Sequence, residues 1–260
     1  MAGPLGLLVE RLWFSSGGAT PGREHTLPSG RMHVAIRLDD VPLRLYADDA
    51  DAEGRLVGSM TLAGARAGYC VKESAAARVV GAQLRPGAAT ALFGMSAAEL
   101  TARHVPLPSL WPDAGATRDE LGSLSDPAAM LALLGRALSE QVGSIRAMHP
   151  DVAAALERWD GDTPVASLVE ESSLSHRHFT AQFRDATGLS PKRYGRVRRF
   201  RRVLAAAHRD PGRSWAQLAA EGGYADQAHL TREFVEFAGT TPAAYRAARP
   251  REELHLPVGR

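Results

Sequence analysis

The C-terminal part of the chain contains an internal repeat of about fifty residues. Residues 175–194 (SHRHFTAQFRDATGLSPKRY) align with residues 226–245 (DQAHLTREFVEFAGTTPAAY) at an offset of 51. This repeat constrains the fold, because both copies must adopt the same unit. The matching pairs are His178/His229, Thr180/Thr231, Phe183/Phe234, Gly188/Gly239, Pro191/Pro242 and Tyr194/Tyr245.

Each copy has the pattern helix, short turn, helix. In the first copy, Ser175 is the expected N-cap of the second helix and Gly188 is its expected end. In the second copy, Ser214 and Gln217 predict a capping box, and Asp226 caps the helix that follows the turn. Two helices joined by a tight Ser- or Gly-containing turn are typical of the helix-turn-helix motif.

A helix of about 20 residues, Ser190 to Arg209, is predicted between the two units. It would be about 30 Å long at the helical rise per residue. Such a connector can hold two helices roughly one DNA turn, about 34 Å, apart on one face of a duplex.

The same region is basic, with eleven Lys and Arg against two Asp between residues 177 and 213. This imbalance indicates a polyanionic partner.

The second copy also carries a known signature. Gly223–Phe234 (GYADQAHLTREF), followed by residues 239–242 (GTTP) and Tyr245-Arg246, resembles the signature of the AraC/XylS family of transcriptional regulators. The resemblance covers about residues 150–250. It implies an all-α domain of two helix-turn-helix units joined by a long helix, with double-stranded DNA as its partner.

The candidate DNA-reading residues follow from helix geometry and from the family pattern. If Phe179 and Phe183 are buried, residues on the opposite face of that helix point outward. An Arg can bond guanine and a Gln can bond adenine bidentately in the major groove. Phosphate contacts are expected from Arg184, Arg196 and Arg198. The expected base-contacting residues are Arg177, Thr180, Ala181, Gln227, Ala228, Thr231 and Arg232.

The N-terminal half shows a different pattern, which predicts a small antiparallel β-sandwich or barrel with appended helices and an α+β fold for the whole chain. Short helices are expected between Pro86 and Gly94 and over Ser96–Arg103. A longer helix, capped by Asp126, carries an apolar stripe that is either core or a dimer seam. That stripe is Met130, Leu134, Leu138, Val142 and Ile145. The predicted strands are Arg31–Leu38, Val41–Tyr46, Arg55–Leu62, Gly68–Glu73 and Arg78–Leu84.

Several classes of function are disfavoured by the sequence. The single cysteine excludes an intramolecular disulfide framework and an all-Cys zinc site. His178 and His229 recur, but no Cys or carboxylate recurs beside them, so a metal site is not expected. No catalytic motif is present, and neither an enzyme activity nor a cofactor is predicted. No apolar run is long enough to span a membrane, and a cytoplasmic location is expected.

We therefore expect a sequence-specific transcription factor with two major-groove recognition helices, controlled by its N-terminal domain. Residues 1–149 are interpreted as an effector-binding or dimerisation domain and residues 150–250 as the DNA-binding domain. Its two units span about 163–188 and 214–239, and residues 251–260 form a tail. A small-molecule effector, a homodimer and RNA polymerase are left open as further partners. The alternative is a small-molecule-binding protein or enzyme whose helical C-terminal domain mediates protein contacts.

Overall fold

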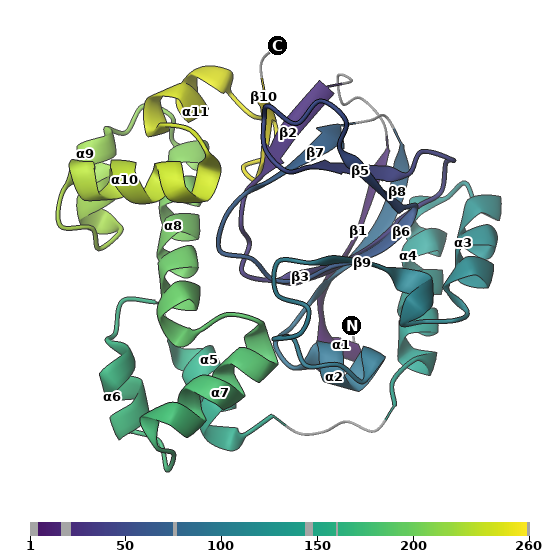
Figure 1. The fold of residues 1–260 in the computed structure, drawn as a ribbon, viewed down its shortest axis with the longest axis horizontal. Coiled ribbons are helices and arrows are strands. Elements are labelled where there is room, and N and C mark those ends of the chain that lie inside the picture. The colour runs from purple at the N-terminus through teal and green to yellow at the C-terminus, as the bar shows by residue number, and fades with distance from the viewer. Residues whose placement is uncertain (1–4, 17–21, 75–76, 144–147, 160, 259–260) are drawn as a thin grey trace.

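The computed structural model describes residues 5–16, 22–74, 77–143, 148–159 and 161–258. Figure 1 shows a two-layer β-sandwich with flanking helices beside an elongated helical part that is built around one long helix. The predicted α+β class, with an N-terminal sandwich and a C-terminal pair of helix-turn-helix units, is confirmed.

The first sheet of the sandwich contains five antiparallel strands in the order β1-β8-β3-β6-β9. Alternate residues of β3 are buried, as expected where one face of a strand lies against a core. These buried side chains include Val34 and Ile36, which are fully enclosed. The strands are β1 (Val9–Ser16), β3 (Met32–Arg37), β6 (Met60–Ala63), β8 (Arg78–Leu84) and β9 (His104–Pro106).

The second sheet has the order β10-β2-β7-β4-β5, and its first strand comes from the C-terminus. The sequence indicated no structure for this tail. Strand β10 pairs antiparallel with β2, with His255 opposite Thr26 and Val258 opposite Arg23. The chain therefore returns to the sandwich after the helical part. The strands are β2 (Gly22–Thr26), β4 (Leu43–Tyr46), β5 (Arg55–Gly58), β7 (Cys70–Ser74) and β10 (His255–Val258).

One predicted strand, Arg55–Leu62, is two strands in the structure. Strand β5 belongs to the second sheet and β6 to the first, so the chain crosses between the layers after Gly58. Gly58 has a φ of 116°, a conformation that L side chains rarely adopt. The other four predicted strands correspond to β3, β4, β7 and β8, whereas β1, β2, β9 and β10 were not predicted.

Short helices cover the ends and one face of the sandwich. The prediction of a helix over Ser96–Arg103 is wrong, because this segment forms turns. Its backbone bonds to a neighbouring loop instead: Ala102 N–H donates to Ala65 O, and Gly64 N–H donates to Arg103 O. The elements here are α1 (Leu5–Leu8), α2 (Ala88–Phe93), a 3₁₀ turn (Leu107–Ser109), α3 (Ala114–Ser123) and α4 (Pro127–Glu140).

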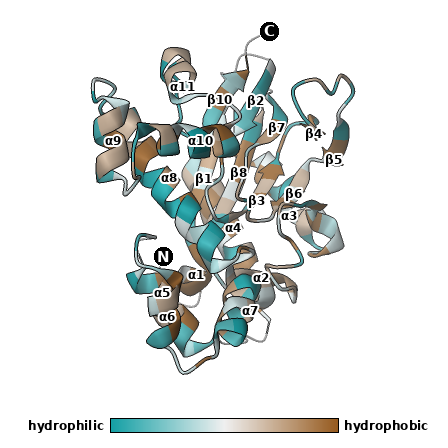
Figure 2. Ribbon diagram, turned by 60° about the vertical axis from the view of Figure 1, so that its left-hand side comes forward, coloured by the Kyte–Doolittle hydropathy of each residue, from teal (hydrophilic) through white to brown (hydrophobic). Residues whose placement is uncertain are grey.

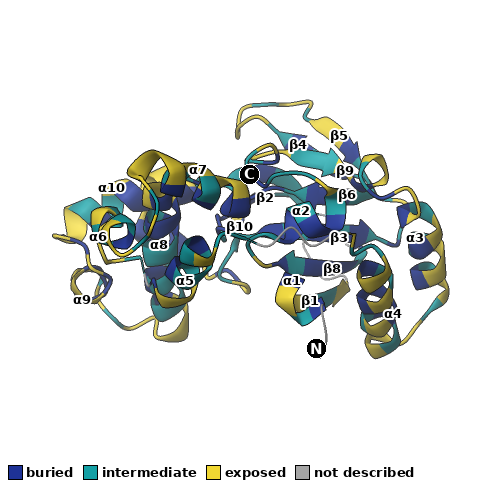
Figure 3. Cartoon of the chain, turned by 90° about the horizontal axis from the view of Figure 1, so that it is seen from below, coloured by how far each residue is buried: buried dark blue, intermediate teal, exposed yellow. Residues whose placement is uncertain are grey.

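Helix α4 carries the apolar stripe that the sequence left open between core and dimer seam. Met130, Leu134 and Leu138 are buried in the core, and α4 lies against β1. Asp126 caps the helix as predicted, accepting from the backbone N–H groups of residues 128 and 129. The helix ends at Glu140, so Val142 follows it, and Ile145 lies outside the described residues. In Figure 3, exposed positions follow the outer surface of α4.

The helical part contains seven helices among the described residues, and α8 connects its two halves (Figure 1). Figure 2 shows both hydrophilic and hydrophobic stretches along α8. One continuous core cluster includes residues of the sandwich and of both halves. The helices are α5 (Pro150–Arg158), α6 (Val165–Glu170), α7 (His176–Thr187), α8 (Pro191–Arg209), α9 (Trp215–Glu221), α10 (Gln227–Ala238) and α11 (Pro242–Ala248). Within the described residues, no helix combines the length and apolarity needed to cross a membrane.

Candidate nucleic-acid interface

The first helix-turn-helix unit consists of α6, a turn and α7. Ser175 caps α7 as predicted: its Oγ accepts from the backbone N–H of His178 at 3.3 Å. Gly188 ends the helix with a left-handed φ of 81°. Phe179 and Phe183 are completely buried, which leaves the opposite face of α7 toward solvent.

Aromatic rings hold the first unit to the start of α8. Phe183 packs edge-on against Tyr194 with ring centroids 5.3 Å apart, and against Trp159 at 5.9 Å. Trp159 also stacks with Tyr194 at 6.1 Å. These distances are typical of favourable aromatic pairs. Apolar packing therefore fixes α7 on the connector.

The second unit repeats the design with α9, a turn and α10. Ser214 and Gln217 form the predicted capping box at the start of α9. Asp226 caps α10, accepting from His229 N–H at 2.6 Å, and Gly239 ends it with a φ of 69°. Phe234 packs edge-on against Phe200 of α8 at 5.2 Å. The capping predicted from the repeat is confirmed in both units.

The candidate base-contacting residues lie on the faces of α7 and α10 opposite the core. In α7, Arg177 and Ala181 are exposed and Thr180 is half-buried. Arg177 makes no ion pair within the described part of the chain. Its guanidinium can therefore meet a partner without breaking an internal contact.

The equivalent face of α10 has the same character. Gln227, Ala228 and Arg232 are exposed, and Thr231 is half-buried. The Thr231 hydroxyl donates to the carbonyl of Gln227 at 2.9 Å, so this hydroxyl is already bonded within the helix. The geometry thus brings each predicted set onto one helix surface.

The three candidate phosphate-contacting residues differ from one another. Arg184 is exposed near the end of α7, and Arg198 is half-buried on α8. The Arg198 guanidinium donates to the carbonyl of Leu156 at 3.5 Å. Arg196 instead points to α10, where its Nε donates to Glu233 at 2.8 Å. An Arg engaged in this way is not available to a phosphate, which argues against the contact expected for Arg196.

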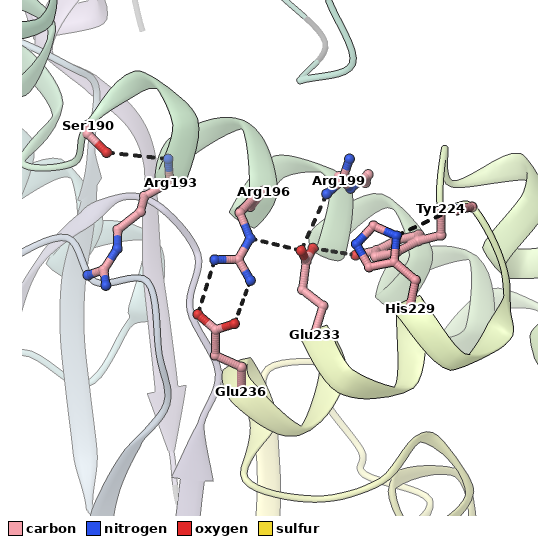
Figure 4. A network of polar contacts seen from close by, with 9 residues as sticks. Ser190, Arg193, Arg196, Arg199, Tyr224, His229, Glu233 and Glu236 are labelled. Carbon is pink, nitrogen blue, oxygen red and sulfur yellow. Dashed lines mark hydrogen bonds and ion pairs between the residues drawn. The ribbon is translucent and has the colours of Figure 1, made fainter. Parts of the chain in front are cut away.

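Figure 4 shows the network around Arg196. Glu233 is 3% exposed and accepts from Arg196, from Arg199 at 3.3 Å and from the Tyr224 hydroxyl at 2.8 Å. Arg196 also donates to both carboxylate oxygens of Glu236. These bonds to Glu236 and Glu233 raise the pKa of Arg196, and burial together with the Glu233 charge raises the pKa of Tyr224. Sequence reasoning missed Glu233, although an acid among the apolar positions of α10 was a usable signal.

The recurring histidines serve the local structure of the units. His229 accepts from the backbone N–H of Ala225 at 3.5 Å and lies edge-on to the Tyr224 ring. His178 is exposed, and its backbone N–H completes the cap of α7. Among the residues that the structure describes, no group of three His, Cys, Asp or Glu could hold a metal ion.

The end of α7 is bonded to the sandwich. The carbonyl of Asp185 accepts from Ala97 N–H at 2.9 Å, and the carbonyl of Gly188 accepts from the Thr101 hydroxyl at 2.6 Å. A Cβ on Gly188 would lie 3.0 Å from the Ala97 carbonyl oxygen. The absence of a side chain at Gly188 thus permits this close approach.

The C-terminal end of α10 is also bonded to the sandwich, through the carbonyl of Ala238. The buried His25 ring lies between the carbonyl of Ala238, 2.9 Å from Nδ1, and Asp49 Oδ1, 2.7 Å from Nε2. The His25 ring stacks on Tyr69 with centroids 4.3 Å apart. A Cβ on Gly239 would lie 2.6 Å from the Tyr69 ring, so glycine is required at both helix ends.

Two surface cavities lie beside these contacts. One of about 300 Å³ is bounded by Arg66–Tyr69 and Thr101–Ala102 of the sandwich and by residues of the helical part, including Arg193 and Glu236. The other, of about 630 Å³, lies on the sandwich and is lined by residues of β4, β5, β7 and the loops around them. Its polar lining includes Arg66 and His104.

Comparison with known proteins agrees with the division seen in the fold. Residues 168–248 match the model of a helix-turn-helix domain, and residues 2–106 match a domain of unknown function, DUF6597. No curated protein matches the chain.

Solved structures of ToxT from Vibrio cholerae align with most of the chain. One, at 9% identity, covers 91% of this chain and 97% of its own, with a TM-score of 0.48. A second, bound to (E)-4-(8-methylnaphthalen-1-yl)but-3-enoic acid, has the same identity and coverage and a TM-score of 0.49.

The matched domain and the two units on one connector define a helix-turn-helix DNA-binding protein. Residues 168–248 form a helix-turn-helix domain of the AraC type, and its second unit carries the segment Gly223–Phe234, which resembles the signature of the AraC/XylS family.

Proposed function

We propose that the protein regulates transcription by placing α7 and α10 together in two successive major-groove segments of one DNA site. The observation that carries this proposal is the connection of both units to a single straight element, α8. Its 19 residues correspond to about 28 Å at the helical rise. That span is close to the roughly 34 Å between half-sites one helical turn apart.

The proposed readers are the exposed faces of the two helices. Arg177, Thr180 and Ala181 would read one block, with Arg177 offering a bidentate contact to guanine. The second block would be read by Gln227, Ala228, Thr231 and Arg232. Apolar contacts with thymine methyl groups are the readout open to the two alanines and to the Thr231 methyl.

Phosphate contacts are proposed for Arg184 and Arg198, which lie on the same helical part as the reading faces. Arg196 is left out because its guanidinium is bonded to Glu233 and Glu236. Contacts of this kind position a protein on the duplex without specifying a sequence.

We assign residues 150–250 to DNA binding and residues 1–149 to control of that activity. Support for control comes from the two contacts with the sandwich, which hold α7 and α10 at their C-terminal ends. A change in the loop of residues 64–69 would reach both ends, since Ala65 approaches Gly188 and Tyr69 approaches Gly239. The tail, residues 251–260, adds β10 to the same sandwich. In this proposal the sandwich also offers surfaces for a small-molecule effector, a second copy of the chain and RNA polymerase.

Selection of bound duplexes from a random library tests the proposal, with the full chain at near-physiological salt. Two sequence blocks about one helical turn apart are the expected result. The double variant Arg177→Ala/Arg232→Ala is expected to lose both blocks while keeping salt-sensitive binding to unrelated DNA. If the wild-type chain selects no motif, the proposal fails. That result would favour the alternative, in which the helical C-terminal domain mediates protein contacts.

A further inference from the structure

A buried carboxylate lies on the side of α10 that faces away from the proposed DNA surface. Glu233 is 3% exposed and shares its face of the helix with Leu230, Phe234 and Phe237, which are all buried. An ionised side chain in such a position is costly unless donors surround it. The DNA reading assigned to Gln227 and Arg232 does not use it.

Three donors from two elements converge on this carboxylate. Arg196 and Arg199, both on α8, donate to Oε2 at 2.8 and 3.3 Å. Tyr224, in the turn between α9 and α10, donates its hydroxyl to Oε1 at 2.8 Å. Glu233 therefore ties the second recognition helix both to the connector and to its own turn (Figure 4).

The donors are themselves held in place. The Arg196 guanidinium bonds to Glu236 and lies 5.0 Å from the centroid of the Phe237 ring. The Arg199 guanidinium lies 4.7 Å from the centroid of the Tyr224 ring. A carboxylate bound by fixed donors has a narrow range of orientations, because hydrogen bonds weaken steeply with angle. Apolar packing alone is not directional in this way.

The first unit lacks this arrangement. The position equivalent to Glu233, 51 residues earlier, is Gln182, which is half-buried and makes no hydrogen bond within the described part of the chain. Its turn residue Ser173 donates to Asp151 instead. The two units therefore differ in what sets the orientation of their second helix.

We infer that Glu233 is a positioning residue for base readout: by accepting from Arg196, Arg199 and Tyr224, it fixes the rotation of α10 about its own axis. Arg232 is the preceding residue, about 100° away around the helix at 3.6 residues per turn. Any rotation of α10 about its axis therefore moves the Arg232 side chain relative to a base edge. This inference rests on the proposed function, because it requires α10 to read DNA.

The variant Glu233→Gln tests the inference, since it keeps the shape of the side chain and removes its charge. Library selection with the full-length variant is expected to weaken discrimination about tenfold in the block read by α10. Discrimination in the block read by α7 is expected to stay at the wild-type level. The matched control is Glu221→Gln, the same chemical change at an exposed acid of the second unit. Glu221 pairs with Arg213 rather than with the donors to Glu233, so this variant is expected to leave both blocks unchanged.

Loss of folded protein does not mimic this result. A merely destabilised chain binds all sequences less at a given total concentration, whereas relative preference among bases in one block does not change. Selection of both blocks by Glu233→Gln with wild-type preference would overturn the inference. Failure of the wild-type chain to select two blocks would instead count against the proposed function.

A second variant covers the case in which Glu233→Gln does not fold. Tyr224→Phe keeps the aromatic ring and removes only the hydroxyl that bonds Glu233. It is expected to weaken discrimination in the α10 block alone, by less than the charge-removing change. Wild-type preference in this variant, together with an unfolded Glu233→Gln, would assign Glu233 to stability only and overturn the inference.

Discussion

The two helix-turn-helix units share their caps, their buried phenylalanines and their terminal glycines, but they are fixed to the connector by different forces. Rings of Trp159, Phe183 and Tyr194 hold the first unit. In the second unit, phenylalanine packing is supplemented by the buried charge of Glu233. In this chain the duplicated sequence preserves the local signals, whereas the interactions that orient each copy have diverged.

The largest expected change in stability comes from the buried phenylalanine that occupies the same position in both units. Phe183 and Phe234 occupy equivalent positions and are completely buried. Replacement of either by Ala is expected to lower the free energy of unfolding by about 3–5 kcal/mol, from lost burial and the cavity left behind. Urea unfolding of the full chain measures this. A loss below about 1 kcal/mol in one variant would show that its unit does not belong to the shared core.

Acid is expected to lower the stability of the chain through two histidines of the sandwich. Burial lowers the pKa of His33 from 6.5 to about 4 and that of His104 to about 3. Both rings stay neutral when folded, while the unfolded rings take up protons near pH 6.5. Stability is thus fully present above pH 6.5 and is lost as the pH falls toward 4, by roughly 2 kcal/mol per ring at pH 5.

Urea unfolding at pH 7 and pH 5 checks this expectation. In His33→Gln the loss between the two pH values is expected to be about half that of the wild type. Equal stability at both pH values in the wild-type chain would contradict the neutral state of these half-buried rings.

Single changes in the two reading faces are expected to act on different blocks of the DNA site. Arg177→Ala should relax base preference only in the block read by α7, and Arg232→Ala only in the block read by α10. Each bidentate contact contributes about 1–3 kcal/mol of discrimination. Binding titrations on single-base variants of a selected site measure this. Relaxation of both blocks by one substitution would mean that the units do not read independently.

The smallest expected effect concerns the N-caps of the two helices. Ser175→Ala and Asp226→Ala each remove a side chain that accepts from a backbone N–H, at 3.3 and 2.6 Å. A loss of about 1 kcal/mol in stability is expected for each. The Asp226 change should be the larger, because a carboxylate also interacts with the helix dipole. Thermal unfolding measures both losses. A larger loss of stability for Ser175→Ala than for Asp226→Ala would contradict the expected contribution of the helix dipole.

Features encoded in neighbouring residues could be predicted from the sequence. The caps at Ser175, Ser214 and Asp226 and the bounds of α8 depend on a few adjacent positions, and all were predicted. The exposed faces of α7 and α10 follow from the same helical periodicity.

Features that depend on distant partners could not be predicted. Strand β10 has four residues and includes Pro257, which is tolerated because the strand lies at the edge of its sheet. Only its pairing with β2 makes it a strand. Arg196 was read as a surface cation because its partner Glu233 is 37 residues away.

In the proposed function, one rigid connector, α8, holds two reading helices on the same face of DNA. Affinity of the full chain for a selected site, measured with 5 or 10 base pairs inserted between its two blocks, tests it most directly. Five base pairs place the second block on the opposite face of the duplex. This insertion is expected to lower the affinity to that of a site with one block mutated. Ten base pairs are not expected to restore it, because α8 has a fixed length. Unchanged affinity with either insertion would contradict the claim.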